Sequence, residues 1–221
     1  MAVEIVEVKR LVAPDVMPCP DPIIEREVIS TILDFCKKSN VLQREFEVEL
    51  DVDDIDDEMQ NCIDINIEEF AGDLRLVSLL ELMVDANAYI PYKRDIRTTI
   101  TNYDYVKDEE YKYYWLPDNR NIRLFDMKVT DSLVWMKASF KPLRTLDEID
   151  DFLFEDWSEG LVAGAKWKIL SMPNKEWTDF KTASYYRSEY RRYLSQAKQA
   201  VVRGASGYSD RVNWKSFGEI D

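Results

Sequence analysis

Histidine is absent from this chain of 221 residues, and its absence removes several kinds of chemistry at once. Imidazole is the commonest general base, a frequent metal ligand and the partner of nucleophilic serine or cysteine. Glycine is also scarce, with six residues, and none of them belongs to a glycine-rich loop that would hold phosphate groups. We therefore expect a protein that is not an enzyme and that binds no cofactor.

Cysteine is almost as rare. Cys19, Cys36 and Cys62 lie too far apart for a Cys-x-x-Cys redox or zinc motif, and their odd number leaves one thiol over after any pairing. We expect all three to be reduced, as in a cytoplasm. Long apolar runs are missing too, and acidic residues interrupt the apolar stretch near Met1, so we expect neither a signal peptide nor a membrane span.

Positive charge is in short supply. The chain has 29 Lys and Arg against 43 Asp and Glu, which gives a net charge of −14. Such a surface should repel phosphate backbones, so sequence-specific binding of nucleic acid is disfavoured. Apolar residues make up 46% of the chain and aromatic residues 12%, which is enough to build a folded core.

The first half of the chain changes from a helical to a strand-like period. Three prolines close residues 1–20 and favour an extended lead-in. Asp21 is a suitable N-cap, and the apolar stripe from Ile24 to Cys36 predicts a helix over 22–39. Alternating, β-branched and aromatic runs then predict strands at 41–50, 63–67, 89–92, 98–106, 111–116, 122–125 and 133–140. The run 74–84 is compatible with either a strand or a helix.

Helical periodicity returns in the last third. Thr145 and Glu148 have the spacing of a capping box and predict a helix that ends near Met172. Asp179 can begin a final helix, for which Gly204 supplies a C-cap. The expected fold class is therefore α+β, with a helical bundle from both chain ends and an inserted antiparallel β domain. The expected parts are a lead-in and first helix at 1–40, the β domain at 41–142, two long helices at 143–204 and a flexible docking tail at 205–221.

Four groups of residues are candidates for function or close packing. The acidic run from Asp51 to Glu58 lacks the ligand spacing of a calcium loop, because Ile55 takes a ligand position, so we expect a solvated loop without metal. Gly160 and Gly164 predict a close helix crossing. The aromatic cluster is a possible surface for a protein or carbohydrate, unless half of it is core; it consists of Tyr111, Tyr113, Tyr114 and Trp115.

The tail combines aromatic side chains with two cations in a segment that has no regular period. Tyr208, Trp214 and Phe217 could act as anchors on a partner, and Arg211 and Lys215 could pair with acidic groups there. Packing of the tail on its own domain is an equally weighted alternative.

Two stretches resemble the head-to-tail adaptor (connector) proteins of tailed bacteriophages. They are Cys19-Pro-Asp-Pro-Ile-Ile-Glu25 with Ile32-Leu-Asp-Phe-Cys-Lys-Lys-Ser39, and Ala138-Ser-Phe-Lys-Pro142 with Gly164-Ala-Lys-Trp-Lys-Ile-Leu-Ser-Met-Pro-Asn-Lys-Glu-Trp177. Aromatic residues also recur in the expected last helix, at Tyr185, Tyr186, Tyr190 and Tyr193. The acidic region 43–132 departs from the family pattern.

The resemblance implies a structural protein with a helical bundle and a β insertion. Such subunits form a homo-oligomeric ring, usually of twelve copies, in the virion neck between the portal protein and tail or neck proteins. DNA passes through the ring without specific binding, and the subunits are made in the host cytoplasm. The alternatives are another tail or baseplate structural protein, or a small enzyme or carbohydrate-binding β domain that uses the aromatic cluster.

Overall fold

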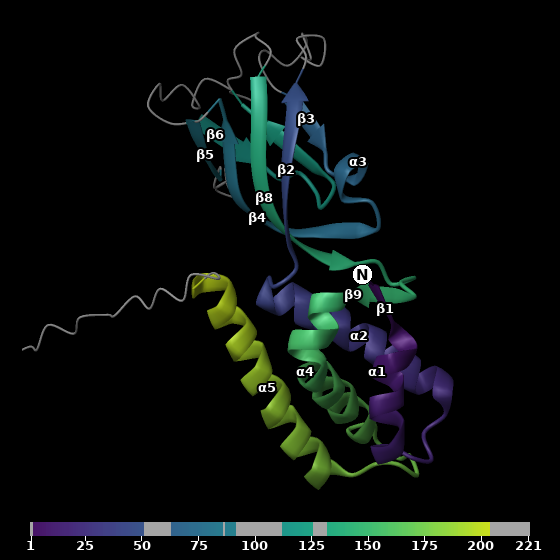
Figure 1. Ribbon diagram of the computed structural model, residues 1–221. Coiled ribbons are helices and arrows are strands. Elements are labelled where there is room, and N and C mark those ends of the chain that lie inside the picture. The colour runs from purple at the N-terminus through teal and green to yellow at the C-terminus, as the bar shows by residue number, and fades with distance from the viewer. Residues whose placement is uncertain (1, 51–62, 86, 92–111, 126–131, 204–221) are drawn as a thin grey trace, which may run out of the picture.

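A curled β-sheet and a group of packed helices form the two ends of the molecule (Figure 1). The computed structural model describes residues 2–50, 63–85, 87–91, 112–125 and 132–203. Its helices are α1 (Ile5–Val12), the 3-10 turn η1 (Ala13–Asp15), α2 (Asp21–Ser39), α3 (Glu68–Ala71), α4 (Asp151–Leu170) and α5 (Phe180–Arg203). Its strands are β1 (Ala2–Glu4), β2 (Gln43–Leu50), β3 (Ile63–Asn66), β4 (Leu74–Val84), β5 (Asn87–Pro91), β6 (Lys112–Trp115), β7 (Asn121–Leu124), β8 (Ser132–Pro142) and β9 (Glu148–Asp150).

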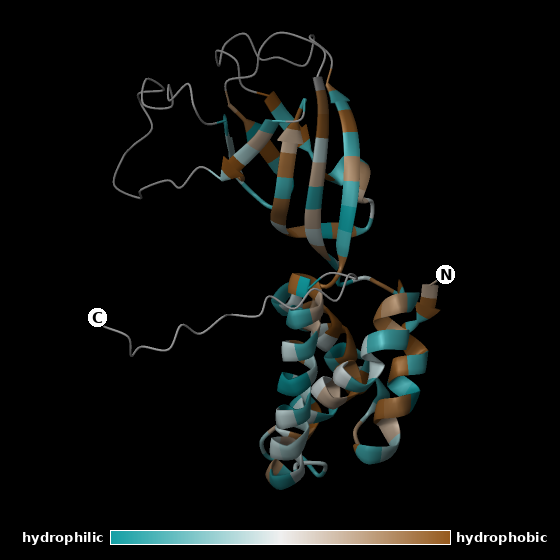
Figure 2. Cartoon of the chain, turned by 60° about the vertical axis from the view of Figure 1, so that its left-hand side comes forward, coloured by the Kyte–Doolittle hydropathy of each residue, from teal (hydrophilic) through white to brown (hydrophobic). Residues whose placement is uncertain are grey.

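The larger sheet has seven strands in the order β2-β8-β4-β5-β6-β7-β3. Within the described residues all neighbours are antiparallel except β5 and β6, which run parallel. Two register shifts interrupt the pairing of β4 with β8, and such irregularities bend a strand and increase its twist. Figure 2 shows hydrophobic and hydrophilic residues alternating along these strands, as expected when one face of a sheet is buried.

The expected fold class is wrong in two respects. The sheet is curled and mixed rather than antiparallel, and the five described α-helices do not form a bundle from both chain ends. A parallel pair needs a crossover connection of about a dozen or more residues, and the chain between Pro91 and Lys112 is long enough to supply one. The helical end also contains strands, because β1 and β9 pair there as a separate small sheet.

The extended lead-in predicted for residues 1–20 is also wrong, because α1 occupies part of it. Ile5, Val8 and Val12 recur at helical spacing and are buried on one face of this helix. The prolines follow α1 and therefore do not interrupt it. Pro14 lies in the first turn of η1, where a missing N–H costs little.

The predicted start of the next long helix is wrong as well. Glu148 belongs to β9, whose Ile149 lies opposite Val3 of β1, and α4 begins only at Asp151. Pairing with β1 gives hydrogen-bonding partners to the backbone of β9. A capping box would provide partners only at the first turn of a helix. The capping-box spacing of Thr145 and Glu148 is therefore coincidental.

Several other predictions are confirmed. The helix predicted at 22–39 is α2, and the ambiguous run 74–84 is the strand β4. Asp179 caps α5, because its Oδ1 accepts the backbone N–H groups of Lys181 at 3.0 Å and Thr182 at 3.1 Å. The strand predicted at 98–106 and the C-cap at Gly204 lie outside the described residues.

Candidate functional site

Gly160 and Gly164 lie where α4 meets α2 and α5. A Cβ atom added to Gly164 would lie 2.5 Å from Cγ2 of Thr31 and 2.6 Å from Cδ2 of Tyr190. A Cβ atom added to Gly160 would lie 2.7 Å from Cβ of Tyr193. Side chains from two other helices thus approach the backbone of α4 at both positions, which a larger residue would prevent.

A buried tyrosine joins α5 to α2 at this crossing. The hydroxyl of Tyr190 donates to Oδ2 of Asp34 at 2.9 Å, and Nζ of Lys38 lies 2.7 Å from the same oxygen. Burial raises the pKa of Asp34, but these two hydrogen bonds and the nearby charges of Lys38 and Lys168 together outweigh it, so the pKa is lowered. Asp34 therefore stays ionised and keeps both donors in place.

A second polar contact links η1, α4 and α5. Nζ of Lys166, a residue only 8% exposed, lies 2.5 Å from Oδ2 of Asp15 and 5.3 Å from the ring centroid of Tyr186. The hydrogen bond from Lys166 lowers the pKa of Asp15. A buried ammonium needs such a partner, so this contact supports the fold.

The aromatic cluster does not form one continuous surface in the described residues. Tyr114 of β6 is 7% exposed and faces the core, whereas Tyr113 and Trp115 lie on the opposite face of the strand. The Arg123 guanidinium lies 5.9 Å from the ring centroid of Trp115. Tyr111 lies outside the described residues.

The other predicted positions are either buried or outside the description. Cys19 and Cys36 are free and buried, and burial raises the pKa of the Cys36 thiol to about 12. Within the described residues, these two thiols are therefore part of the packed interior. Cys62, the acidic run Asp51–Glu58 and the tail residues Tyr208, Arg211, Trp214, Lys215 and Phe217 lie outside the described residues.

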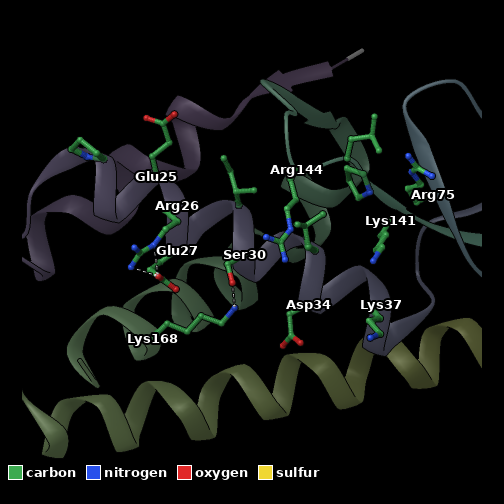
Figure 3. Close-up of a pocket in the computed structure, with 15 residues that line it drawn as sticks. Glu25, Arg26, Glu27, Ser30, Asp34, Lys37, Arg75, Lys141, Arg144 and Lys168 are labelled. Atoms are coloured by element: carbon green, nitrogen blue, oxygen red, sulfur yellow. Dashed lines mark hydrogen bonds and ion pairs between the residues drawn. The ribbon is translucent and has the colours of Figure 1, made fainter. Parts of the chain in front are cut away.

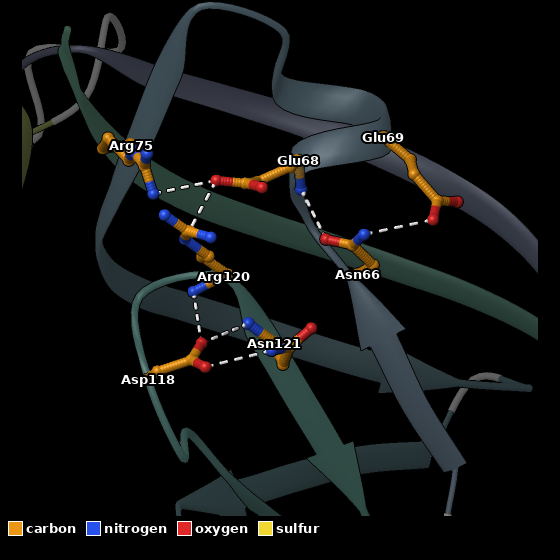
Figure 4. A network of polar contacts seen from close by, with 7 residues as sticks. All are labelled: Asn66, Glu68, Glu69, Arg75, Asp118, Arg120 and Asn121. Carbon is orange, nitrogen blue, oxygen red and sulfur yellow. Dashed lines mark hydrogen bonds and ion pairs between the residues drawn. The ribbon is translucent and has the colours of Figure 1, made fainter.

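A network of charged and amide side chains holds α3 against two strands of the sheet (Figure 4). The Glu68 carboxylate lies 2.8 Å from Arg75 on β4 and 3.1 Å from Arg120 at the turn before β7. In that turn Asp118 accepts the backbone N–H groups of Arg120 and Asn121, which lowers its pKa. The network occupies surface positions and links α3 to β4 and to the turn before β7.

A pocket that the sequence did not predict lies where the helices meet the sheet (Figure 3). It has a volume of about 940 Å³ and lies between α2, the end of α4 and the adjoining ends of β4 and β8. Six cationic side chains line it, against three carboxylates from α2. We call it the cationic pocket and define it by Arg26, Lys37, Arg75, Lys141, Arg144 and Lys168.

Only two of these six cations have a carboxylate partner among the described residues. Arg26 lies 2.9 Å from Glu27, and Arg75 pairs with Glu68. In the described parts of the chain, no carboxylate lies within ion-pair distance of the remaining four, which are Lys37, Lys141, Arg144 and Lys168. Positive charge therefore accumulates in one concave site of a protein that is acidic as a whole.

Two of the four have surroundings that cost folding free energy. Lys168 is half-buried, its Nζ donates to Oγ of Ser30 at 3.0 Å, and burial lowers its pKa. Lys141 lies directly opposite Arg75 in the pairing of β8 with β4, and like charges opposite each other destabilise a sheet. Both cations are therefore held in the pocket although their surroundings oppose the charge.

The cations of the pocket come from distant parts of the sequence, so no local sequence motif predicts them.

Searches for a metal site, a membrane-spanning helix and related proteins add no further candidate. Among the described residues no three His, Cys, Asp or Glu side chains could hold a metal ion together. None of the described helices has the length and apolar character needed to cross a membrane. A scan against protein-family models and a search of curated proteins both find no match for this chain.

Proposed function

We propose that this chain is a structural virion protein, the head-to-tail adaptor of a tailed bacteriophage. It assembles as a ring in the neck, in the resembled family usually of twelve copies, and contacts the portal on one side and tail or neck proteins on the other. It is made in the host cytoplasm and performs no catalysis.

One observation carries this proposal: the residues behind the resemblance pack against one another. Phe35 and Cys36, from the first stretch, are completely buried, and Gly164 and Ala165, from the second, are buried on α4. The Phe35 ring lies 6.2 Å from that of Tyr190, one of the recurring aromatic residues of the last helix. These residues hold three helices together, which is the role expected of motifs in a protein that acts through its shape.

The helices also expose apolar side chains that neighbouring subunits could cover. Val6 and Leu11 on α1 are 44% and 48% exposed, and Phe180, Tyr185 and Val202 on α5 are 62% to 84% exposed. Exposed apolar and aromatic side chains are typical of surfaces that contact other proteins. A net charge of −14 also suits a ring around DNA, because an acidic lumen lets the phosphate backbone slide without adhering.

The direct test is the mass of the protein in solution with and without the portal protein from the same genome. Multi-angle light scattering should show a complex that contains a ring of this chain on the portal. Failure to bind the portal would contradict the proposal. A rise in Tm with a panel of saccharides, and none with the portal, would favour the carbohydrate-binding alternative.

The tail residues give a second test of portal attachment. Truncation after Gly204 should preserve the Tm and abolish attachment, and Trp214→Ala should weaken attachment by about 2 kcal/mol or more if this side chain is the central anchor. Tyr208→Ala, which removes a smaller anchor from the same segment, serves as the comparison. Attachment of the truncated chain at the wild-type affinity would assign the docking role to the helices.

A further inference from the structure

The cationic pocket offers an anion two kinds of contact. Lys37, Lys141, Arg144 and Lys168 supply the positive charge, while Ile29 and Leu33 are among the apolar side chains that line the space between α2 and the sheet. Figure 3 shows that the cations approach from different elements, with Lys37 and Lys168 on helices and Lys141 and Arg144 at the end of β8 and just beyond it. An extended acidic peptide with aliphatic side chains matches both kinds of contact.

The sequence contains one segment with this chemistry. Asp51-Val-Asp-Asp-Ile-Asp-Asp-Glu58 combines six carboxylates with two aliphatic side chains. A nucleic acid would supply anions without the aliphatic side chains, and the charge of −14 on the whole protein opposes its approach. We propose that the cationic pocket binds the acidic run Asp51–Glu58 of a second copy of this chain.

The contact must form between two chains because the acidic run cannot reach the pocket of its own chain. The run follows Leu50, which lies opposite Ser132 in the sheet, whereas Lys141 of the pocket lies nine positions farther along β8. Nine strand positions span about 30 Å. β2 ends at Leu50, at the end of the sheet farther from the helices (Figure 1), and a connection of this length between Leu50 and Ile63 can reach at most about 20 Å from these two residues.

Such a contact joins one end of a subunit to a different site on the next, which makes it heterologous. Heterologous contacts produce closed rings when the rotation between subunits closes, and filaments when it does not. The contact between pocket and acidic run would join neighbouring copies in the ring. The ring itself rests on the proposed adaptor function. The contact also accounts for the four cations that lack a carboxylate within the described part of their own chain.

The first experiment measures binding of a fluorescent peptide of residues 50–60 to the full-length chain by anisotropy. We expect saturable binding that weakens as salt rises, at least tenfold weaker binding to Lys141→Gln/Lys168→Gln, and unchanged binding to Arg191→Gln/Lys198→Gln, which removes two exposed cations from α5. A peptide with every Asp replaced by Asn should not bind. The Tm of each variant confirms that it is folded. Equal binding to both double variants would overturn the inference, as would a labelled oligonucleotide that binds the pocket in place of the peptide.

The second experiment tests the contact between whole chains. One variant carries Lys141→Glu/Lys168→Glu and so has no working pocket, and the other carries Asp53→Lys/Asp56→Lys and so has no working acidic run. Each alone should have the mass of a single chain, and their mixture should stop at two chains, because only one working contact remains. A mixture that stays at one chain would refute the inference. Portal-bound rings that form equally well from the pocket variant would refute the contact between pocket and acidic run but leave the adaptor function standing. Binding of the peptide without attachment to the portal would support the contact and contradict the adaptor function.

Discussion

The two faces of α2 differ in how well their polar and charged groups are matched. On the inner face the Thr31 hydroxyl donates to the Glu27 carbonyl at 2.7 Å, and Phe35 is completely buried near Gly160 of α4. On the outer face Lys37 lines the cationic pocket, where no described carboxylate lies within ion-pair distance of it. The inner face is therefore built for packing, whereas the outer face keeps charge that packing does not use.

This difference separates residues that hold the fold from residues available to a partner. The inner face tolerates few substitutions, because protein interiors are close-packed and a buried polar group needs a hydrogen-bonding partner. The like charges of Arg75 and Lys141 lie opposite each other at the pocket, although their repulsion destabilises the sheet. Substitutions on the two faces should therefore affect stability in opposite directions.

The largest effect is expected at the inner face, for Gly164→Leu. The new side chain would meet Thr31 and Tyr190, whose atoms already lie within 2.6 Å of an added Cβ. We expect a loss of about 3 kcal/mol in the free energy of unfolding, which lowers the Tm by about 6 to 12 °C. Ala200→Leu on the exposed surface of α5 is the matched control and should leave the Tm nearly unchanged. An unaltered Tm for Gly164→Leu would remove the basis for the close crossing.

Asp15→Asn should have an intermediate effect, because it leaves the buried ammonium of Lys166 without its carboxylate. Asp15 is partly exposed and water offsets some of the loss, so we expect a cost of about 1 to 2 kcal/mol at pH 7 in urea denaturation. The pKa of Asp15 is lowered in the folded state, so its contribution is present above the unfolded pKa of about 3.9 and is lost as the pH falls through the folded pKa. The difference between wild type and variant should therefore shrink below about pH 4.

The control for this prediction is Lys166→Met, which removes the ammonium. In that background Asp15→Asn should cost much less than in the wild type, because no buried charge is left without a partner. Equal costs in the two backgrounds, or a difference that persists in acid, would show that Asp15 contributes by another route.

The smallest effect is expected at the outer face and has the opposite sign. Lys141→Gln removes the like charge opposite Arg75 and should stabilise the protein by about 0.2 to 1 kcal/mol. Lys137→Gln, at another position of β8, breaks the 2.9 Å ion pair with Glu45 of β2 and should not stabilise the protein. A loss of stability for Lys141→Gln would mean that this cation of β8 supports the fold. The pocket on the outer face of α2 would then not differ from the inner face in this respect.

The sequence predicted the elements whose patterns are long and regular. The apolar stripe from Ile24 to Cys36 and the N-cap Asp179 are local signals, and the helices that they predict are present. The helix α1 was missed because its apolar stripe is short and because the prolines that follow Val12 favour an extended backbone, although they lie beyond the end of the helix. The strand β9 was missed because it depends on β1, at the opposite end of the chain.

The candidate site depends even more on tertiary structure. Lys37, Lys141 and Lys168 lie far apart in the sequence and meet only after α2, β8 and α4 are packed together. The opposition of Arg75 and Lys141 follows from the register of two strands, which no local pattern specifies. The glycines of α4 were different, because small residues at helical spacing are visible in the sequence before their neighbours are known.

The most direct test of the difference between the two faces of α2 is a cryo-EM reconstruction of the ring that we propose this chain forms on a portal protein. We predict a ring in which the inner face of α2 packs against α4 and α5 within each subunit, while the cationic pocket holds residues 51–58 of the adjacent subunit. A ring in which the pocket of every subunit faces solvent, or a portal that carries no ring of this chain, would contradict the account.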